Sequence, residues 1–373
     1  MGAEAWPDDE LSRGQVLAGR YRLTEFLGRG GMGLVFAALD LATGSAVAVK
    51  LPRREVRRRK KALARFRQES RAAARLSGPH VVRVSDVAEL DDGTPFIVME
   101  LLVGIDLASE LDARGALPLA EAVDLVLEAA AGVAEAHAAG IVHRDLKPHN
   151  LFLANVAEPG AHRSVKVLDF GISKLGGADV PRVTTTGARL GTPLYVSPEQ
   201  LVSAKYVDAR TDVWSLGVIL YELVTGTLPF EGPTAIAVAA AIQTVEPPPP
   251  SSRRPGLPPE LDAVVMRALA KRPDERFGSV AEFVRALAPF AASPASATRV
   301  TAFAERPARA ARPEAPRAGE TLADSPRAEA ARSGARVATP ESSSATLSGS
   351  SRLLLVLAAL LGVLLLALAV ASR

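Results

Sequence analysis

The feature that most constrains this chain is a short polar stretch, His143-Arg144-Asp145-Leu146-Lys147-Pro148-His149-Asn150. It places a carboxylate, an ammonium and an amide on one loop, and a second carboxylate, Asp169, comes before a Phe-Gly pair further along. These groups suit phosphoryl transfer, in which one group orients a hydroxyl, one neutralises phosphate charge and two hold a divalent metal ion. The chain is therefore expected to fold so that these four side chains meet.

Composition sets outer limits on the class of protein. With 373 residues, 48% of them hydrophobic, the chain is long enough for more than one structural unit. Its formal net charge of +3 is too small for this length to indicate a basic nucleic-acid-binding surface, so no nucleic-acid partner is expected. It contains no cysteine, which excludes disulfides and thiolate metal sites and fits a reducing compartment.

Changes in composition divide the chain into segments. Residues 1–20 form an acidic N-terminal extension that resembles neither a signal peptide nor a transit peptide, and residues 21–290 are mixed and periodic, as in a globular domain. Residues 291–352 are rich in Ala, Pro, Ser and Arg with few large apolar side chains, which predicts a disordered juxtamembrane linker.

Residues 353–371 are an unbroken apolar run. As a helix the run would extend about 28 Å, close to the hydrocarbon thickness of a bilayer, and it lacks the polar stripe of a surface helix. A buried core helix is the alternative, but only linker precedes the run, so we expect a transmembrane tail anchor. Arg332, Arg336 and Arg352 flank it on one side against Arg373 on the other, which predicts a single pass through the inner membrane with the domain in the cytoplasm.

A glycine-rich stretch lies between two predicted strands. Gly28, Gly30 and Gly33 would let two strands and their turn lie close over a triphosphate, with backbone N–H groups facing its oxygens. Such a pattern alone could also mark a dinucleotide-binding fold. That fold would continue into a helix, whereas here a second strand, Ala46–Lys50, follows. The order of elements favours a mononucleotide.

Taken together, these motifs resemble the eukaryotic-like (Hanks-type) Ser/Thr protein kinases, in particular the bacterial branch. The resemblance covers about residues 21–290 and implies an α+β, two-lobed fold: a small lobe over 21–100 with an antiparallel sheet, and a mostly helical large lobe over 104–290. It also implies that the cofactors are ATP and Mg²⁺, or Mn²⁺ in its place. The implied ATP-binding residues are Leu27, Gly28, Arg29, Gly30, Gly31, Met32, Gly33, Leu34, Val35, Ala48, Lys50, Met99, Glu100 and Leu102.

The resemblance also assigns roles to the catalytic groups. Asp145 would orient the acceptor hydroxyl, and Lys147 would stabilise the charge on the phosphoryl group in transfer. Asn150 and Asp169 would hold the metal ions. Lys50 would contact the α- and β-phosphates and pair with a glutamate, Glu69, on the helix expected over Lys61–Leu76.

Further residues are expected to regulate or brace the site. Ser197-Pro198-Glu199 stands where the family usually has Ala-Pro-Glu, and Glu199 is expected to pair with Arg276. Asp212 would brace the catalytic loop. Arg144 would meet a phosphothreonine, so we expect activation by phosphorylation of Thr184 or Thr186. Together with Lys147, Thr192 implies serine or threonine rather than tyrosine as the acceptor.

Three activities are compatible with the chain. The leading hypothesis is a membrane-anchored Ser/Thr kinase acting on protein substrates, with self-association in the membrane favouring phosphorylation in trans. A membrane-tethered pseudokinase scaffold is the alternative, but Lys50, Asp145 and Asp169 are all present. A small-molecule phosphotransferase would not need the complete segment from Asp169 to Glu199.

Ala358 and Gly362, in the predicted membrane helix, form a small-xxx-small pair of the kind found where membrane helices dimerise.

Overall fold

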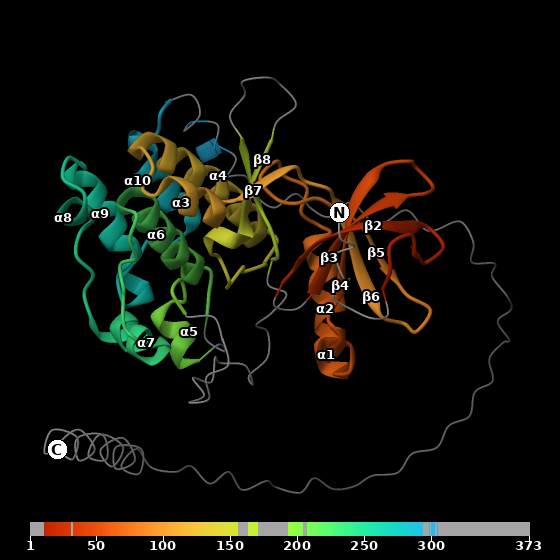
Figure 1. Ribbon diagram of the computed structural model, residues 1–373. Coiled ribbons are helices and arrows are strands. Elements are labelled where there is room, and N and C mark those ends of the chain that lie inside the picture. The colour runs from red at the N-terminus through yellow and green to blue at the C-terminus, as the bar shows by residue number, and fades with distance from the viewer. Residues whose placement is uncertain are drawn as a thin grey trace, which may run out of the picture. The chain divides into compact units, whose positions relative to one another are not determined.

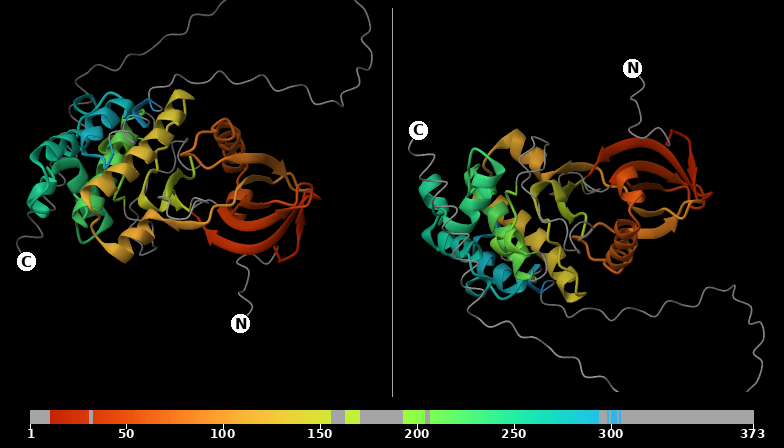
Figure 2. Two further views of the ribbon diagram at one scale, coloured as in Figure 1. Left: turned by 90° about the horizontal axis from the view of Figure 1, so that it is seen from above. Right: turned by 90° about the horizontal axis from the view of Figure 1, so that it is seen from below.

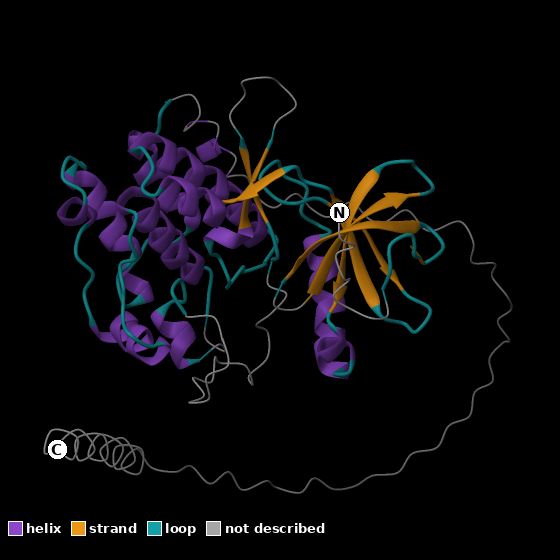
Figure 3. Cartoon of the chain, viewed as in Figure 1, coloured by secondary structure: helices purple, strands orange, loops and turns teal. Residues whose placement is uncertain are grey.

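The fold is described from a computed structural model (Figure 1). The structure describes residues 11–30, 33–155, 163–170, 193–203 and 207–293, together with 298, 300–302 and 304; the side chain of Glu69 is outside this description. Strands dominate one part of the described chain and helices the other (Figure 3). This division confirms the predicted two-lobed arrangement.

The small lobe is built on a six-stranded antiparallel sheet with the order β1-β2-β3-β4-β6-β5. Its strands are β1 (Val16–Leu17), β2 (Tyr21–Arg29), β3 (Gly33–Asp40), β4 (Ala46–Pro52), β5 (Val84–Glu89) and β6 (Pro95–Glu100). Side chains alternate along β2, so Tyr21 and Leu23 point into the core while Arg22 and Thr24 are exposed. The strand predicted over Ala46–Lys50 is confirmed and continues to Pro52.

The sheet begins earlier than the sequence suggests. Strand β1 pairs with β2, and Leu11 and Leu17 are 5% and 2% exposed in the core of the small lobe. Residues 11–20, expected to lie in the N-terminal extension, are therefore part of the folded lobe. Two buried leucines in this segment are too few for its composition to indicate that it is folded.

Two helices belong to the small lobe, α1 (Arg54–Arg57) and α2 (Lys60–Ala73). In both views of Figure 2 the orange helical segment lies against one side of the strands. Phe66 of α2 is 1% exposed and packs with Ile97 of β6 and Val84 of β5. This apolar contact fixes α2, and with it the backbone of Glu69, beside the strand that leads to the second lobe.

The large lobe is mostly helical. Its helices are α3 (Leu107–Arg114), α4 (Leu119–Ala138), α5 (Pro198–Val202), α6 (Arg210–Thr225), α7 (Ala235–Thr244), α8 (Pro250–Arg253), α9 (Pro259–Ala268) and α10 (Val280–Leu287), with short 3-10 turns η1 (Pro148–Asn150), η3 (Pro273–Glu275) and η4 (Ala288–Phe290). Helices α4 and α6 supply the centre of the core: most of α6 is buried, as is the Ala-rich face of α4.

A second, three-stranded sheet carries the polar loop. Its strands are β7 (Gly104–Asp106), β8 (Leu151–Ala154) and β9 (Ser164–Val167), in that order and antiparallel. Gly104, at φ +152°, is needed there because a Cβ would stand 2.0 Å from the carbonyl oxygen of Leu153. The sheet places Asn150 before β8 and Asp169 after β9, at the same end of an antiparallel pair.

The described chain continues past the expected domain end. Ala291, Val300 and Ala304 pack against the core of the large lobe, so part of the predicted linker is ordered. Val300 and Ala304 are four residues apart, the spacing that places two side chains on one face of a helix. Among the described residues there is no helix with the length and hydropathy to cross a membrane, and the run 353–371 lies outside them.

Candidate active site

The glycine-rich hairpin is the turn between β2 and β3. Gly28 pairs with Val35 and Arg29 with Leu34. Gly33 is the glycine for which space is critical, because a Cβ there would lie 2.7 Å from the carbonyl oxygen of Leu51 on the neighbouring strand. At Gly28 and Gly30 a Cβ would meet nothing closer than 3.8 Å. Their surface is open, as expected if a ligand approaches it; Gly31 and Met32 lie outside the described residues.

Lys50 links the two lobes. Its side chain is 4% exposed, and its Nζ lies 2.5 Å from Oδ1 of Asp169. Asp169 has a φ of +56°, in the left-handed region that few residues other than glycine adopt. The structure thus brings together the predicted phosphate-binding lysine and one of the predicted metal ligands. The predicted pairing of Lys50 with Glu69 lies outside the described residues.

The catalytic loop brings together the other three predicted groups. Lys147 donates from Nζ to Oδ2 of Asp145 at 2.9 Å, and Nδ2 of Asn150 donates to the carbonyl oxygen of Asp145 at 2.7 Å. Asn150 is 8% exposed on the turn η1, and its own carbonyl accepts from the N–H of Leu168 at 2.9 Å. This last bond ties the loop to the residue before Asp169, so both predicted metal ligands are held by one set of contacts.

Asp212, on α6, holds the backbone of that loop through hydrogen bonds. It is fully buried and accepts from the backbone N–H groups of His143 and Arg144, each at 2.8 Å, and from Nε2 of His137 at 2.7 Å. Burial alone would raise the pKa of Asp212, but the hydrogen bond and charge of His137 outweigh it, so the pKa lies below its usual value. These contacts are the ones that the predicted bracing role requires, and His137 is a partner that the sequence did not predict.

Phe170 fixes the backbone beside Asp169. It is 3% exposed, and its ring centroid lies 5.1 Å from that of His143. The His143 ring is buried and its Nε2 contacts the carbonyl oxygen of Leu168 at 2.8 Å. Because both sides of residue 169 are held in this way, the side chain of Asp169 is directed toward Lys50.

The strand β6 leads into the connection between the lobes. Met99 pairs with Ala48 across the sheet, which places both predicted adenine-site residues on neighbouring strands. The side chain of Glu100, which is predicted to bind ATP, has other partners: its Oε1 accepts from Nζ of Lys166 and from the backbone N–H of Arg83, each at 2.8 Å. The backbone N–H of Glu100 is engaged as well, because it donates to the carbonyl oxygen of Arg83 at 3.0 Å. Leu27 and Leu102 are not fully buried.

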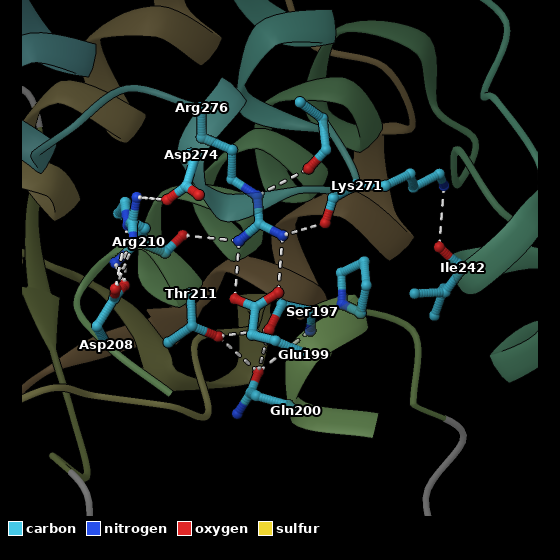
Figure 4. A network of polar contacts seen from close by, with 12 residues as sticks. Ser197, Glu199, Gln200, Asp208, Arg210, Thr211, Ile242, Lys271, Asp274 and Arg276 are labelled. Atoms are coloured by element: carbon cyan, nitrogen blue, oxygen red, sulfur yellow. Dashed lines mark hydrogen bonds and ion pairs between the residues drawn. The ribbon is translucent and has the colours of Figure 1, made fainter. Parts of the chain in front are cut away.

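The predicted ion pair between Glu199 and Arg276 is present and is bidentate (Figure 4). Nη1 and Nη2 of Arg276 lie 2.8 and 2.7 Å from the two carboxylate oxygens of Glu199. The guanidinium is buried and also donates to the carbonyl oxygens of residues 210, 270 and 271. This pair anchors α5 to the segment between α9 and α10.

Ser197, which the resemblance places where Ala is usual, is buried in the same network. Its hydroxyl lies 2.7 Å from that of Thr211 and 3.2 Å from Oε1 of Gln200, with which it forms a capping box for α5. Gln200 in turn donates from Nε2 to the carbonyl oxygen of Arg144 at 2.8 Å. The hydroxyl group that Ser197 has and Ala lacks is therefore hydrogen-bonded locally. Through Gln200 the same network connects α5 with the catalytic loop.

The regulatory threonines Thr184 and Thr186, and Thr192, lie outside the described residues. Arg144 has a φ of +64° and donates from Nη2 to the carbonyl oxygen of Val207 at 3.5 Å. The predicted meeting of Arg144 with a phosphothreonine remains a prediction.

The donor set fits a hard divalent cation only in part. Asn150 and Asp169 offer an amide and carboxylate oxygens, the ligands that Mg²⁺ prefers. Within the described ranges no group of three or more His, Asp or Glu side chains could hold a metal ion. An ion at Asn150 and Asp169 would therefore complete its coordination with water or with nucleotide phosphate oxygens, the arrangement typical of Mg²⁺ bound together with a nucleotide.

Sequence comparison gives relatives among bacterial serine/threonine-protein kinases. A profile of the protein kinase domain matches residues 21–286. The chain is 39% identical over 283 residues to the serine/threonine-protein kinase pkn3 of Myxococcus xanthus, covering 74% of this chain and 51% of that protein. It is 40% identical over 316 residues to PknB of Mycolicibacterium smegmatis, covering 84% and 49%. The chain thus spans about half the length of these relatives.

Structural comparison gives the same family of folds. The crystal structure of the PknI kinase domain of Mycobacterium tuberculosis superposes with a TM-score of 0.60 at 30% sequence identity. The match covers 75% of this chain and 100% of that domain. The similarity therefore extends over the two lobes described above.

Proposed function

Because the chain belongs to the protein kinase family, we propose that it is a serine/threonine protein kinase that transfers the γ-phosphate of ATP to protein hydroxyl groups. The observation that carries this proposal is the meeting of Lys50 with Asp169 next to the contact of Asp145 with Lys147. A lysine for phosphate, a carboxylate for metal and a carboxylate for the acceptor hydroxyl are the parts that phosphoryl transfer requires.

In this mechanism each side chain has a defined task. Asp145 accepts a hydrogen bond from the acceptor hydroxyl and orients it toward the phosphorus, while Lys147 lies at 2.9 Å from the same carboxylate and offsets negative charge during transfer. Lys50 neutralises phosphate charge. Mg²⁺, held by Asn150 and Asp169, would supply further charge neutralisation when bound.

The acceptor that fits best is a protein. Residues 193–203 lie against the large lobe: the hydroxyl of Tyr195 donates to Glu222 at 2.7 Å, and Ser215 donates to the carbonyl oxygen of Tyr195 at 2.9 Å. Glu199 is held by Arg276. This anchored segment, here called the substrate platform (residues 193–199), supplies a fixed surface for an extended polypeptide, which a small molecule would not need.

We further propose that the kinase activates itself by phosphorylating Thr184 or Thr186, and that residues 353–371 anchor it in a membrane with the kinase domain in the cytoplasm. The motif order and the position of Arg144 next to Asp145 support the first statement. The apolar run and the arginines before it support the second. Anchoring would concentrate two copies in one plane, which favours phosphorylation in trans.

The test is phosphate transfer by the full-length chain in vesicles, with labelled ATP, Mg²⁺ and dephosphorylated casein. We expect Asp145→Asn to lower the rate by about 100-fold or more while leaving the unfolding temperature unchanged. Asp91→Asn, in an exposed turn, serves as the matched control and should retain full activity. No transfer by the wild type would overturn the proposal and favour the scaffold.

The two further statements have separate readouts. Autophosphorylation predicts label at Thr184 or Thr186, and a slower rate for the double change Thr184→Ala and Thr186→Ala. Anchoring predicts that the full-length chain floats with vesicles and resists alkaline extraction, whereas residues 1–312 do not float. Activity with no label on either threonine, or extraction of the full chain by alkali, would remove the corresponding statement alone.

A further inference from the structure

Lys271, a residue that the phosphoryl-transfer mechanism does not use, lies half-buried between two aromatic rings and the end of α7. Its Nζ is 4.0 Å from the ring centroid of Phe230 and 5.3 Å from that of Trp214. The two rings are stacked, with centroids 5.5 Å apart. The same Nζ donates to the carbonyl oxygen of Ile242 at 2.9 Å, in the last turn of α7 (Figure 4).

The contact with Ile242 places a cation at a helix C-terminus. The last four carbonyl groups of a helix have no partner within it, and the helix dipole is negative there, so an ammonium at this point stabilises the end of the helix. The described part of α7 has no basic residue of its own in the last turn. Lys271 therefore supplies from outside the charge that α7 lacks.

Helix α7 in turn holds the substrate platform. Gln243, the residue after Ile242, donates from Nε2 to the carbonyl oxygen of Pro198 at 2.6 Å. On the other side, the backbone carbonyl of Lys271 accepts from Arg276, which binds Glu199. Pro198 is thus held by α7 and Glu199 by Arg276. Lys271 connects these two supports, because its side chain contacts Ile242 of α7 and its backbone carbonyl accepts from Arg276.

The charges around Lys271 are compatible with a cation at neutral pH. Burial lowers the pKa of Lys271; Glu246 raises it and the neighbouring Arg276 lowers it, and together these effects bring the pKa to about 8. The charge of Arg276 is in turn balanced by Glu199. At pH 7 the side chain is mostly protonated and held out of solvent, where a cation–π contact is stronger than at an exposed site.

We propose that Lys271 is a positioning residue for the protein substrate: it fixes the C-terminal end of α7 so that Gln243 and Arg276 together hold the substrate platform. This rests on the proposed kinase function but adds a residue outside the phosphate-handling groups. Among the described residues, Lys271 contacts Phe230, Trp214, Ile242 and Arg276 and none of the nucleotide-handling residues. Its loss should therefore affect the binding of the acceptor protein and not of ATP.

The test compares the full-length wild type with Lys271→Met, which keeps the apolar stem and removes the charge. We expect the KM for dephosphorylated casein to rise about fivefold while the KM for ATP and the kcat stay within about twofold. Lys271→Arg, which can still donate and stack on Phe230, should restore the KM for casein. A purely structural defect would instead change both KM values or lower kcat.

The matched control is Arg272→Met. Arg272 carries the same charge, but its side chain is 74% exposed and pairs with Glu275 in its own turn at 3.6 Å. It should leave both KM values unchanged. An equal rise in the KM for casein in Arg272→Met, or none in Lys271→Met, would overturn the proposal.

A second measurement does not depend on catalysis. Hydrogen–deuterium exchange should be faster at the backbone amides of residues 238–245 in Lys271→Met than in the wild type, with no change in the sheet of the small lobe. Unchanged exchange in α7 would overturn the positioning role even if no phosphate transfer were detected. Faster exchange without any transfer by the wild type would support it and reject only the proposed activity.

Discussion

At the scale of single residues, Asp212 is fully buried and holds the backbone of the catalytic loop. Its two carboxylate oxygens accept from two successive backbone N–H groups and from His137. Those N–H groups belong to residues 143 and 144, which immediately precede Asp145. A change at Asp212 therefore acts on the position of the catalytic carboxylate without touching the substrate.

We expect Asp212→Asn to reduce both stability and activity. The amide keeps one acceptor oxygen but turns an NH₂ group toward N–H donors, so at least one buried donor is left unsatisfied. The free energy of unfolding should fall by about 2–4 kcal/mol, as measured by urea denaturation. Asp208→Asn, four residues earlier and 52% exposed in its ion pair with Arg210, is the control and should change it by less than about 1 kcal/mol. Equal effects at the two sites would contradict this view of Asp212.

At the scale of elements, one face of α4 makes polar contacts with the segment between α2 and β5. Glu135 accepts from the backbone N–H groups of Ser77 and Gly78, at 2.8 and 2.9 Å, and Glu128 lies 3.6 Å from Nδ1 of His80. Between these two acids, at the spacing that keeps residues on one helix face, stands Gly132. The end of α2 is thereby attached to the helical lobe.

Gly132→Ala tests that attachment. A Cβ at this position would lie 2.5 Å from the carbonyl oxygen of His80, which is backbone and cannot rotate away. We expect the substitution to destabilise the chain by about 1–3 kcal/mol in thermal or urea unfolding, because overpacking outweighs the roughly 1 kcal/mol that alanine gains in a helix. A variant more stable than the wild type would show that α4 and the segment can separate at little cost.

The elements themselves follow from local patterns in the sequence, but their polar partners do not. The strand ending at Lys50 and the helix beginning near Lys61 are confirmed because alternation and helix-forming composition are local properties. The contact of His137 with Asp212 joins residues 75 positions apart, and the contact of Lys271 with Ile242 depends on how α7 packs. No residue spacing in the sequence predicts these long-range polar contacts.

At the scale of the whole molecule, the sequence predicts the centre of the domain better than its limits. The described motif residues from Gly28 to Arg276 are brought together largely as expected, since phosphoryl transfer needs those residue types close to one another. The limits depend on a few apolar residues in polar surroundings, such as Leu11 and Val300. Composition averaged over a window cannot register single apolar side chains that are buried or partly buried, so the predicted limits at residues 21 and 290 both lie inside the folded part.

The C-terminal limit gives a direct test. Residues 1–312 form one compact unit, and Ala291, Val300 and Ala304 contribute to its core. A chain ending at residue 290 loses these contacts, together with the bond from the N–H of Ala292 to Asp124 at 3.2 Å. We expect its free energy of unfolding in urea to be about 1–3 kcal/mol below that of residues 1–312, since each buried aliphatic side chain contributes on this order.

The matched comparison is between residues 1–312 and the same segment carrying Val300→Ser, which should account for a large part of the difference because it removes the largest apolar side chain of the three. If the chain ending at 290 is as stable as residues 1–312, then the contacts of residues 291–304 do not contribute to folding. Those residues would then belong to the linker in energetic terms, and the boundary near residue 290 would stand. If the loss appears, the tether to the proposed membrane anchor begins after residue 304 and is correspondingly shorter.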